Sequence, residues 1–476
     1  MLDKKYFFPI LLLFSVITRI VTSVYYIEDI DSLRFALSMQ EYSLVKLQPH
    51  FPGYPVFIFF AKILYLLTGN MGISFSIIGS ISLFVIIYYS IKLCNIKGIS
   101  PTGTFLSLLL FFNPLIWLMS NRYMPDLMGL GIALMSLYYL LFASDKNRYF
   151  DYGFLLSGVL FGVRLSYVPI LIVPIIYSII TKPNKMKRLY SISIGFSIWF
   201  IPFVYISGFE NLLLAASNQT VGHFTDFGGT IFTEFNLFKR LSYFTQILWA
   251  DGLGGYWNGR AFPTFITSIC ILFFVTQYRY DKNWSWLKID QYKLIVISLV
   301  IYMVWIFLFQ NIIYKSRHIL PVLHFALIFV GLGYRSSRNG RMIVSDIIAI
   351  ILLLNLSLIT YTLTMQHKSS TAISQLNTYI SVTNDSLDII SIPLINFYLK
   401  SHGQDHNYIN IDPNNPQGFN QITNIRKNNI IIGEFRRLFE EHYTIIPDTV
   451  FYHNPYMNRM WSKIDTYHLV PKYNGY

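Results

Sequence analysis

The chain has 476 residues, of which 54% are hydrophobic and 13% are charged. Soluble domains carry about a quarter charged residues, so this composition excludes an ordinary soluble globular protein. The formal net charge of +13 would suit a nucleic-acid-binding protein, but the positions of the basic residues argue against that class. Cys94 and Cys270 are the only cysteines and lie in or beside apolar stretches, so a zinc framework is also excluded.

Apolar segments near twenty residues long recur along most of the chain, each long enough to cross about 30 Å of hydrocarbon. The stretch 151–181 is broken near Arg164 and Pro169 and is interpreted as two short spans that meet at the far side of the membrane. Residues 53–69 are apolar but of borderline length, and they predict an interfacial or re-entrant helix on the outer side. With that exception the sequence predicts eleven spanning helices: 6–26, 72–91, 101–119, 124–143, two within 151–181, 188–206, 261–278, 291–310, 318–334 and 341–363.

The basic residues are distributed unevenly between the connections of these helices. If the N-terminus is cytoplasmic, 17 of the 37 Lys and Arg residues fall on short cytoplasmic connections, whereas two short outer connections hold only Arg122, Lys315 and Arg317. This asymmetry is the positive-inside pattern of membrane proteins, and it accounts for much of the net charge without nucleic acid. The 17 residues are Lys4, Lys5, Lys92, Lys97, Lys146, Arg148, Lys182, Lys185, Lys187, Arg188, Arg279, Lys282, Lys288, Lys293, Arg335, Arg338 and Arg341.

This orientation leaves two outer loops, 27–71 and 207–260, and a C-terminal segment outside the membrane. After residue 363 the chain becomes rich in Asn, Asp, His and Lys, and short β-prone segments alternate with an amphipathic segment near 434–442 that predicts a helix. The β-prone segments are 429–433, 443–451 and 466–470. The expected fold class is an all-α polytopic membrane domain, residues 1–363, followed by a small extracytoplasmic α/β domain, residues 364–476.

Acidic residues cluster where the first predicted helix leaves the membrane, at Glu28, Asp29 and Asp31. The apolar and charged residues that follow Asp31 suit a short helix lying in the interface. A carboxylate held there can remove a proton from an incoming hydroxyl or amine, as a general base does. The alternative is that these acids only mark the water end of a span.

A stiff segment follows, with three prolines and a glycine within residues 48–55. Because proline restricts the backbone, His50 is expected to be held in place near the acidic residues. The alternative is that this segment is only a rigid entry to the next helix.

Together, D-S-L-R-F-A-L at 31–37 and P-H-F-P-G-Y-P-V-F-I-F-F-A-K at 49–62 resemble the first outer loop of GT-C polytopic glycosyltransferases. Protein O-mannosyltransferases and lipid A aminoarabinose transferases belong to that superfamily. In it, an acidic residue, often part of an Asp-Glu pair, stands four positions before an aromatic residue, and a His-Pro-Pro segment opens the next helix. Asp31 matches the acid, since it stands four positions before Phe35, and His50 and Pro52 match the second motif.

The sequence departs from the family pattern beside the acid. Ser32 stands where the family usually has Glu, which weakens a metal site built on paired carboxylates, and Phe51 replaces the first proline of the second motif. Asp29, shifted by two positions, is the alternative base.

Two later segments also resemble the family. S-N-R-Y-M-P-D at 120–126 is similar to a short outer connection that carries a polar or acidic residue before the next span, here Asp126. R-H-I-L-P at 317–321 is similar to an Arg-Tyr-Leu-Leu-Pro stretch that opens a late helix, with His318 in place of Tyr. The resemblance covers roughly residues 1–334.

The resemblance implies transfer of a sugar from a polyprenyl-phosphate carrier, held in membrane lipid, to a lipid, glycan or protein acceptor on the non-cytoplasmic face. Asp31 or Asp29 would be the catalytic base. Guanidinium groups match phosphate oxygens well, so the donor phosphate is expected at Arg122, Arg317 and Lys315. Substrate contacts are expected from His50, Asp126, Arg164, Trp257, Arg260 and His318.

These roles have structural alternatives. Arg19, Arg164 and Arg317 could instead be snorkelling side chains or members of structural ion pairs. The Gly-rich aromatic segment 249–260 could close over a sugar, but such segments are as often interfacial anchors.

The main alternative function is a membrane transporter or flippase for a lipid-linked or small polar substrate. Transporters usually place polar groups near the bilayer midplane and often have repeated halves, whereas these acids cluster at one face without a repeat. The sequence has no G-x-x-x-x-G-K-[ST] loop and no H-E-x-x-H helix. The missing phosphate-binding loop argues against ATP-driven transport. We expect no required cofactor, and a divalent cation is left open. Scarce cysteines favour a bacterial inner membrane over an endoplasmic reticulum, with the N-terminus cytoplasmic and the C-terminus outside.

Overall fold

The computed structural model describes residues 6–143, 150–225, 228–280, 289–383, 386–411 and 425–472. The chain divides into two compact units. The helical unit comprises Met1–Tyr25 and Arg34–Met365, and the mixed unit comprises Tyr26–Leu33 and Gln366–Tyr476. Of the basic residues used to predict the orientation, six lie outside the described residues: Lys4, Lys5, Lys146, Arg148, Lys282 and Lys288.

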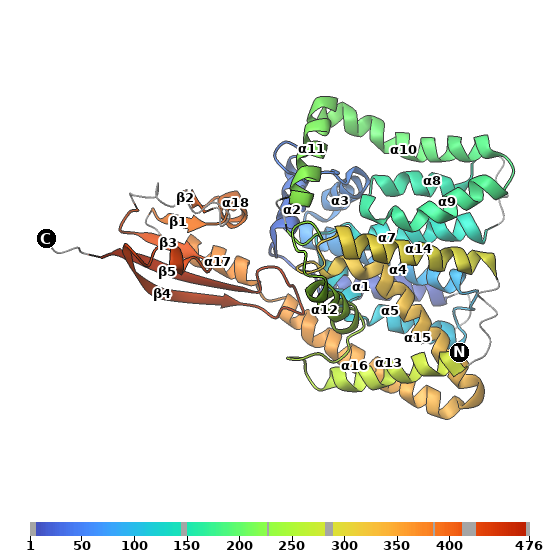
Figure 1. The fold of residues 1–476 in the computed structure, drawn as a ribbon. Helices are drawn as coiled ribbons and strands as arrows, with labels where there is room; N and C mark the ends of the chain where they lie inside the picture. Colours follow the sequence, from blue (N-terminus) through green and yellow to red (C-terminus); the bar gives the residue numbers. More distant parts are fainter. Residues whose placement is uncertain are drawn as a thin grey trace. The chain divides into compact units, whose positions relative to one another are not determined.

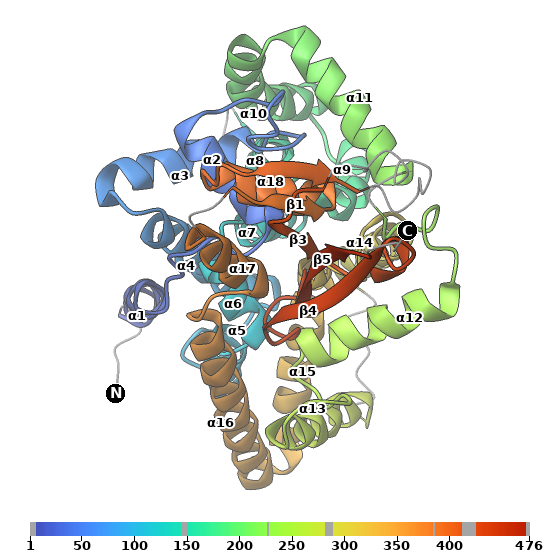
Figure 2. The ribbon, with the colours of Figure 1, turned by 90° about the vertical axis from the view of Figure 1, so that its left-hand side faces the viewer.

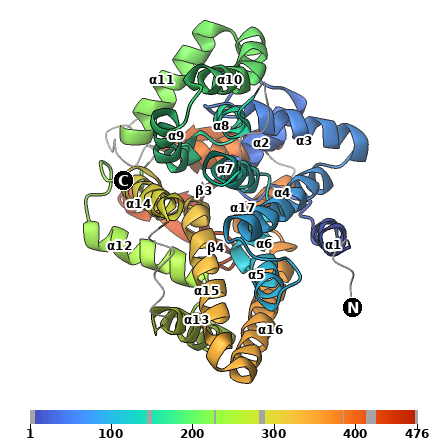
Figure 3. The same cartoon turned by 90° about the vertical axis from the view of Figure 1, so that its right-hand side faces the viewer.

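The helical unit is built almost entirely from helices (Figure 1). In chain order they are α1 (Phe7–Val21), α2 (Ile30–Gln40, begun in the mixed unit), α3 (Pro55–Thr68), α4 (Met71–Leu93), α5 (Pro101–Phe111), α6 (Pro114–Asn121), α7 (Asp126–Leu141), α8 (Tyr152–Phe161), η1 (Leu165–Tyr167), α9 (Pro169–Thr181), α10 (Lys185–Ser207), α11 (Phe209–Thr225), α12 (Leu237–Gln246), η2 (Ile247–Gly252), α13 (Pro263–Tyr280), α14 (Asp290–Phe309), η4 (Ser316–Ile319), α15 (Leu320–Gly340) and α16 (Met342–His367). Helix α7 lies at the centre, packed against α4, α8 and α9 (Figure 3).

Among the described residues, five helices are long and apolar enough to cross a membrane. They are α4, α10, α14, α15 together with η4, and the helix that begins at Met342; a sixth span results if α5 and α6, which meet at 55°, form one crossing. The chain is therefore a multi-pass membrane protein, but the predicted count of eleven spans is not confirmed. The difference arises because several apolar segments form helices shorter than the apolar runs; α1, with 15 residues, is about 22 Å long.

The predicted break within 151–181 is confirmed, because α8 ends at Phe161, α9 begins at Pro169 and Arg164 lies between them. The helix expected after Asp31 is also present, as α2. Whether α3 crosses the membrane stays a prediction.

Buried polar groups complete the bend between α5 and α6. Arg19 is fully buried in α1, and its Nη2 donates to the carbonyl of Phe111, the last residue of α5, at 2.9 Å. Its guanidinium group lies 3.6 Å from the ring centroid of Trp117. The hydroxyl of Thr360 donates to the next carbonyl, that of Phe112, at 2.6 Å. Because the last carbonyls of a helix have no partner within the helix, these contacts give Arg19 a structural role.

The mixed unit contains a five-stranded sheet with the strand order β2-β1-β3-β5-β4, whose strands are labelled in Figure 1 and drawn from another side in Figure 2. Its elements are α17 (Ala372–Ser381), β1 (Asp388–Ser391), α18 (Pro393–Ser401), β2 (Asn407–Asn410), β3 (Asn429–Ile432), η6 (Arg436–Leu438), β4 (Tyr443–Tyr452) and β5 (Lys463–Pro471). Strands β2, β1 and β3 are parallel, whereas β5 is antiparallel to both β3 and β4. The three strands predicted from the sequence are confirmed as β3, β4 and β5.

The helix predicted near 434–442 is wrong. Only the short turn η6 forms there, after Gly433, whose φ of +109° is in the region that favours glycine. The segment connects β3 to β4 and places Phe439 in the core with Ile431 and Tyr467. A segment of nine residues is too short to form a stable helix by itself, so this packing determines its structure.

Candidate active site

A buried carboxylate lies between two arginines in the helical unit. Asp126 begins α7, Arg164 lies between α8 and η1, and Arg317 lies in η4. Asp126 Oδ1 is 2.8 Å from Arg164 Nη2, and Asp126 Oδ2 is 3.9 Å from Arg317 Nε. The three side chains are 0%, 6% and 7% exposed, respectively. We call these residues the arginine cluster; two guanidinium groups share one carboxylate, so the cluster carries net positive charge and suits an anion.

Local sequence explains how the arginine cluster forms. The carboxylate of Asp126 stands in the first turn of α7, where the helix dipole favours negative charge. One turn later, Gly129 leaves room for Arg164, because a Cβ added at Gly129 would stand 2.5 Å from the Cβ of Arg164. The rings of Tyr54 and Tyr167 each lie 5.8 Å from the Arg164 guanidinium group.

The proline-rich segment connects to the arginine cluster through Tyr54. Nη1 of Arg164 donates to the Tyr54 hydroxyl at 3.3 Å, and that hydroxyl lies 3.2 Å from Nε2 of His50. The His50 ring also packs edge-on against Phe35. The structure therefore joins His50 and Arg164, both predicted from the sequence, through a tyrosine that sequence reasoning did not single out. The position of Tyr54 beside Pro55 in the proline-rich segment was the sequence feature that could have indicated it.

The remaining residues predicted near the donor lie on the same connections. His318 is buried beside Arg317, and its carbonyl accepts a hydrogen bond from the Tyr302 hydroxyl at 2.9 Å. The amide of His318 donates to the carbonyl of Lys315 at 3.4 Å, so Lys315 stands at the start of η4. Arg122 is buried at the end of α6, with Nη1 3.8 Å from the sulfur of Met119.

The Gly-rich aromatic segment adds a second buried pair. Nη2 of Arg260 lies 4.0 Å from Oδ1 of Asp251, and both side chains are almost fully buried. The amide of Arg260 donates to the carbonyl of Trp257 at 3.0 Å. Element η2, which contains Asp251, packs against η4, which contains Arg317. The substrate roles of Trp257 and Arg260 stay predictions.

The second outer loop is fastened to the end of α14. Nη1 of Arg240 donates to the carbonyl of Gly229 at 2.7 Å, and its Nε donates to the carbonyl of Phe307 at 3.0 Å. His223 Nε2 lies 2.6 Å from the carbonyl of Phe309. Sequence reasoning missed Arg240, because nothing in its local sequence distinguishes a residue that caps a helix 67 positions away.

The acidic segment, which comprises Glu28, Asp29 and Asp31, belongs to the mixed unit and is buried there. Oδ1 of Asp29 accepts a hydrogen bond from the amide of Ser32 at 2.8 Å. This contact makes Asp29 the N-terminal cap of α2. Oδ2 of Asp29 accepts from the side-chain amide of Asn458 at 3.3 Å. Asp31 is in the first turn of α2 and is 2% exposed.

Residues from the end of α16 and from α18 complete the surroundings of the acidic segment. Nε2 of His367 lies 2.8 Å from a carboxylate oxygen of Glu28. The hydroxyl of Tyr398 donates to the carbonyl of Ile27. Burial, followed by the charges of Asp29 and Glu28, raises the pKa of Tyr398 well above its usual value, so this hydroxyl stays a hydrogen-bond donor.

No group of three or more His, Cys, Asp or Glu side chains among the described residues is arranged to hold a metal ion. Glu28 and Asp29 instead accept hydrogen bonds from amide, hydroxyl and imidazole groups. We therefore derive no chemical step that passes through a metal.

No protein-family model and no curated protein sequence matches the chain. Its structure is similar to that of ArnT from Cupriavidus metallidurans bound to undecaprenyl phosphate, with a TM-score of 0.53, 12% identity and 97% of each chain covered. The same enzyme in the apo state gives a TM-score of 0.52 at 11% identity, covering 96% of this chain and 97% of that one. The archaeal oligosaccharyltransferase AglB from Archaeoglobus fulgidus, in complex with an inhibitory peptide and a dolichol-phosphate, gives 0.51 at 11% identity, covering 99% of this chain and 75% of that one. Both are GT-C enzymes.

The chain has the GT-C fold. The resemblance drawn from the first outer loop is thus confirmed for the fold. It extends over nearly the whole chain and not only over residues 1–334. Within this GT-C fold, three of the predicted residues, Asp126, Arg164 and Arg317, come together in one ion-pair cluster.

Proposed function

We propose that this chain is a membrane glycosyltransferase that moves a sugar from a polyprenyl-phosphate-linked donor to a lipid, glycan or protein acceptor. The observation that carries the proposal is the buried arginine cluster, which has an excess of positive charge. The fold is shared with ArnT, which was solved with undecaprenyl phosphate, and with AglB, which was solved with a dolichol-phosphate. A buried cationic site in such a fold suits a lipid phosphate.

The arginine cluster would stabilise the departing phosphate. As the bond between the anomeric carbon and the phosphate oxygen breaks, negative charge grows on the phosphate, and guanidinium groups already in place stabilise that charge. Asp126 contacts Arg164 at 2.8 Å and Arg317 at 3.9 Å, so the carboxylate holds Arg164 more closely. We assign the phosphate contacts to Arg122, Arg317 and Lys315, which the topology proposed from the positive-inside pattern puts on the two short outer connections.

The base would be Asp31. Its carboxylate takes a proton from the acceptor hydroxyl or amine, the acceptor atom attacks the anomeric carbon, and the polyprenyl phosphate leaves. Asp29 is the alternative candidate, and its two carboxylate oxygens accept hydrogen bonds from Ser32 and from Asn458. Those contacts suit a residue that fixes the start of α2.

The orientation proposed from the positive-inside pattern puts this chemistry on the non-cytoplasmic face of a bacterial inner membrane, with the N-terminus cytoplasmic and the C-terminus outside. The connections that carry Arg122 and Arg317 would then face outwards, as would the acidic segment.

Radiolabelled sugar transfer from a panel of polyprenyl-phosphate donors tests the proposal in membranes that contain the chain. We expect label to move with the wild type and to fall by about 10²–10⁴-fold with Asp31→Asn. Glu41→Gln is the matched control, because Glu41 is an exposed acid on the same connection. Transfer retained by Asp31→Asn would overturn the role of Asp31. No transfer with any donor would overturn the enzyme assignment, and would direct the next assay to lipid or solute movement.

A further inference from the structure

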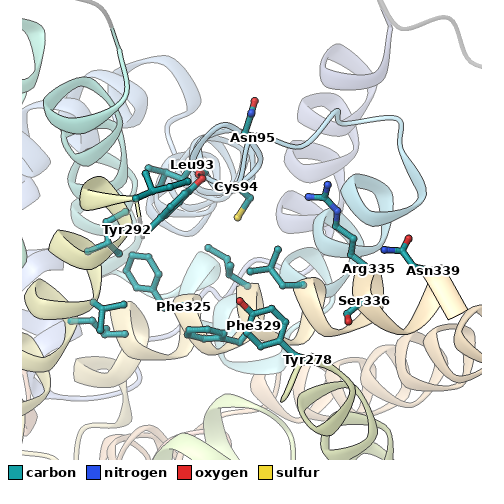
Figure 4. A pocket seen from close by; sticks show the side chains of 16 residues that line it. Leu93, Cys94, Asn95, Tyr278, Tyr292, Phe325, Phe329, Arg335, Ser336 and Asn339 are labelled. Carbon is teal, nitrogen blue, oxygen red and sulfur yellow. The ribbon is translucent and has the colours of Figure 1, made fainter. Parts of the chain in front are cut away.

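A cavity of about 500 Å³ lies between α4, α13, α14 and α15 in the helical unit (Figure 4). Its walls are largely apolar and aromatic and include Leu299, Phe325, Ile328 and Phe329. A cavity of this size falls within the range of small-molecule and cofactor sites, about 300–1,000 Å³. It is large enough to accept an apolar chain.

One part of the cavity wall is polar. Arg335, Ser336 and Asn339 line it from the last turns of α15, and Asn95 lines it from the residues that follow α4 (Figure 4). Arg335 is exposed, and no carboxylate among the described residues forms an ion pair with it. The next arginine, Arg338, differs in this respect because its Nε lies 2.9 Å from Oδ1 of Asp346.

This cavity is distinct from the arginine cluster. Arg317 precedes α15, whereas Arg335 lies fifteen residues beyond Leu320, the first residue of that helix. At 1.5 Å per residue, the two arginines are separated by at least about 20 Å along the helix. The cavity therefore lies towards the opposite end of α15 and does not belong to the site proposed for glycosyl transfer.

We propose that the cavity binds an anionic phospholipid from the membrane leaflet at this end of the helices. An acyl chain would lie against Phe325 and Phe329, and the headgroup phosphate would contact Arg335. Charge complementarity supports this occupant, because Lys92, Lys97, Arg335 and Arg341 add positive charge at this end, whereas two acids there, Asp290 and Asp346, are each paired with a basic residue. Basic pockets between membrane helices are recognised sites for anionic lipid headgroups.

The test uses the purified full-length chain in detergent with fluorescent phosphatidylglycerol as the probe. We expect one saturable site, from which unlabelled phosphatidylglycerol displaces the probe and phosphatidylcholine does so poorly. Arg335→Gln should weaken binding by about fivefold or more, the effect of one basic residue near a lipid headgroup. Arg341→Gln is the matched control, since Arg341 is exposed at the end of the same helix but does not line the cavity.

Two further binding measurements distinguish a lipid held in the cavity from a lipid on the outer surface and from a soluble phosphate ligand. Val296→Trp would fill the cavity from α14 and should abolish binding while the size-exclusion profile stays unchanged. Soluble glycerol phosphate should not compete. Equal losses with Arg335→Gln and Arg341→Gln, equal competition by phosphatidylcholine, or competition by glycerol phosphate would each overturn the proposal.

Discussion

The arginine cluster and the acidic segment differ in the sign of the charge that is in excess. In the arginine cluster, the single carboxylate is surrounded by guanidinium groups, and positive charge is in excess. In the acidic segment, three carboxylates lie close together in the sequence, and amide, hydroxyl and imidazole groups form hydrogen bonds with Glu28 and Asp29. Both regions are almost fully buried. A region of the first kind suits an anion, whereas a region of the second kind suits a proton acceptor.

If the chain transfers sugar as proposed, the reaction needs both kinds of region. Breaking the bond to a phosphate requires cations, whereas activating an acceptor requires a base.

The largest effect is expected from Asp126→Ala, which leaves two buried arginines beside each other. Breaking a buried ion pair by removing one partner costs about 3–5 kcal/mol. We expect most of the variant to be lost from the monodisperse peak in size-exclusion chromatography. Asp290→Asn is the control, because Asp290 forms an exposed pair with Lys293, and such pairs contribute about 0–1 kcal/mol. Normal folding of Asp126→Ala would contradict a structural dependence on this carboxylate.

Arg317→Lys should separate charge from geometry in the arginine cluster. The substitution keeps the positive charge but loses the two-pronged hydrogen bonding of guanidinium with phosphate. We expect the variant to fold and its kcat/KM for the polyprenyl-phosphate donor to fall about tenfold or more, as hydrogen bonds to charged groups are worth about 1.5–3 kcal/mol. An unchanged kcat/KM would move the phosphate contact to another basic residue.

Asp29 and Asp31 should respond differently to substitution if only one of them is the base. Asp29→Ala removes the cap of α2 and should lower the free energy of unfolding by about 1 kcal/mol, while Asp29→Asn retains a capping side chain and should be nearly neutral. Thermal melting of both variants, together with transfer activity, measures this. Loss of activity in a stable Asp29→Asn variant would make Asp29 the base.

The smallest effect is a pH dependence of the mixed unit. Burial lowers the pKa of His402 below its usual value of 6.5. Between those two pKa values the unfolded chain binds more protons than the folded chain, so the free energy of unfolding falls as the pH drops below about 6.5. His402→Gln should lose this dependence. Hydrogen exchange of α18, compared between variant and wild type at the same pH, measures the difference, and a constant difference from pH 7.5 to 5.5 would contradict it.

Much of the fold could be predicted from the sequence, because local patterns determine it. Apolar runs predicted the helices, the break at Arg164 followed from the interrupted hydrophobic run, and alternating residues predicted β3, β4 and β5. The span count and the helix near 434–442 could not be predicted reliably. The span count depends on where each helix ends within an apolar run. The structure of 434–442 depends on how Phe439 packs in the core.

The candidate site could be predicted only in part. Asp126, Arg164 and Arg317 were each singled out from their local sequence, but their ion pairs connect segments far apart in the chain. Glu28 meets His367 across 339 residues, and no local pattern indicates such a partner. Tyr54 was missed because an aromatic residue among prolines is unremarkable until Arg164 packs against it.

A product balance in proteoliposomes decides whether the purified chain transfers sugar from a polyprenyl-phosphate donor. The assay quantifies both products, the transferred sugar and the released polyprenyl phosphate, for the wild type and for Asp31→Asn. We expect equal amounts of the two products with the wild type and loss of both with a well-folded Asp31→Asn variant. Movement of intact donor across the bilayer, without either product, would contradict the proposed glycosyl transfer.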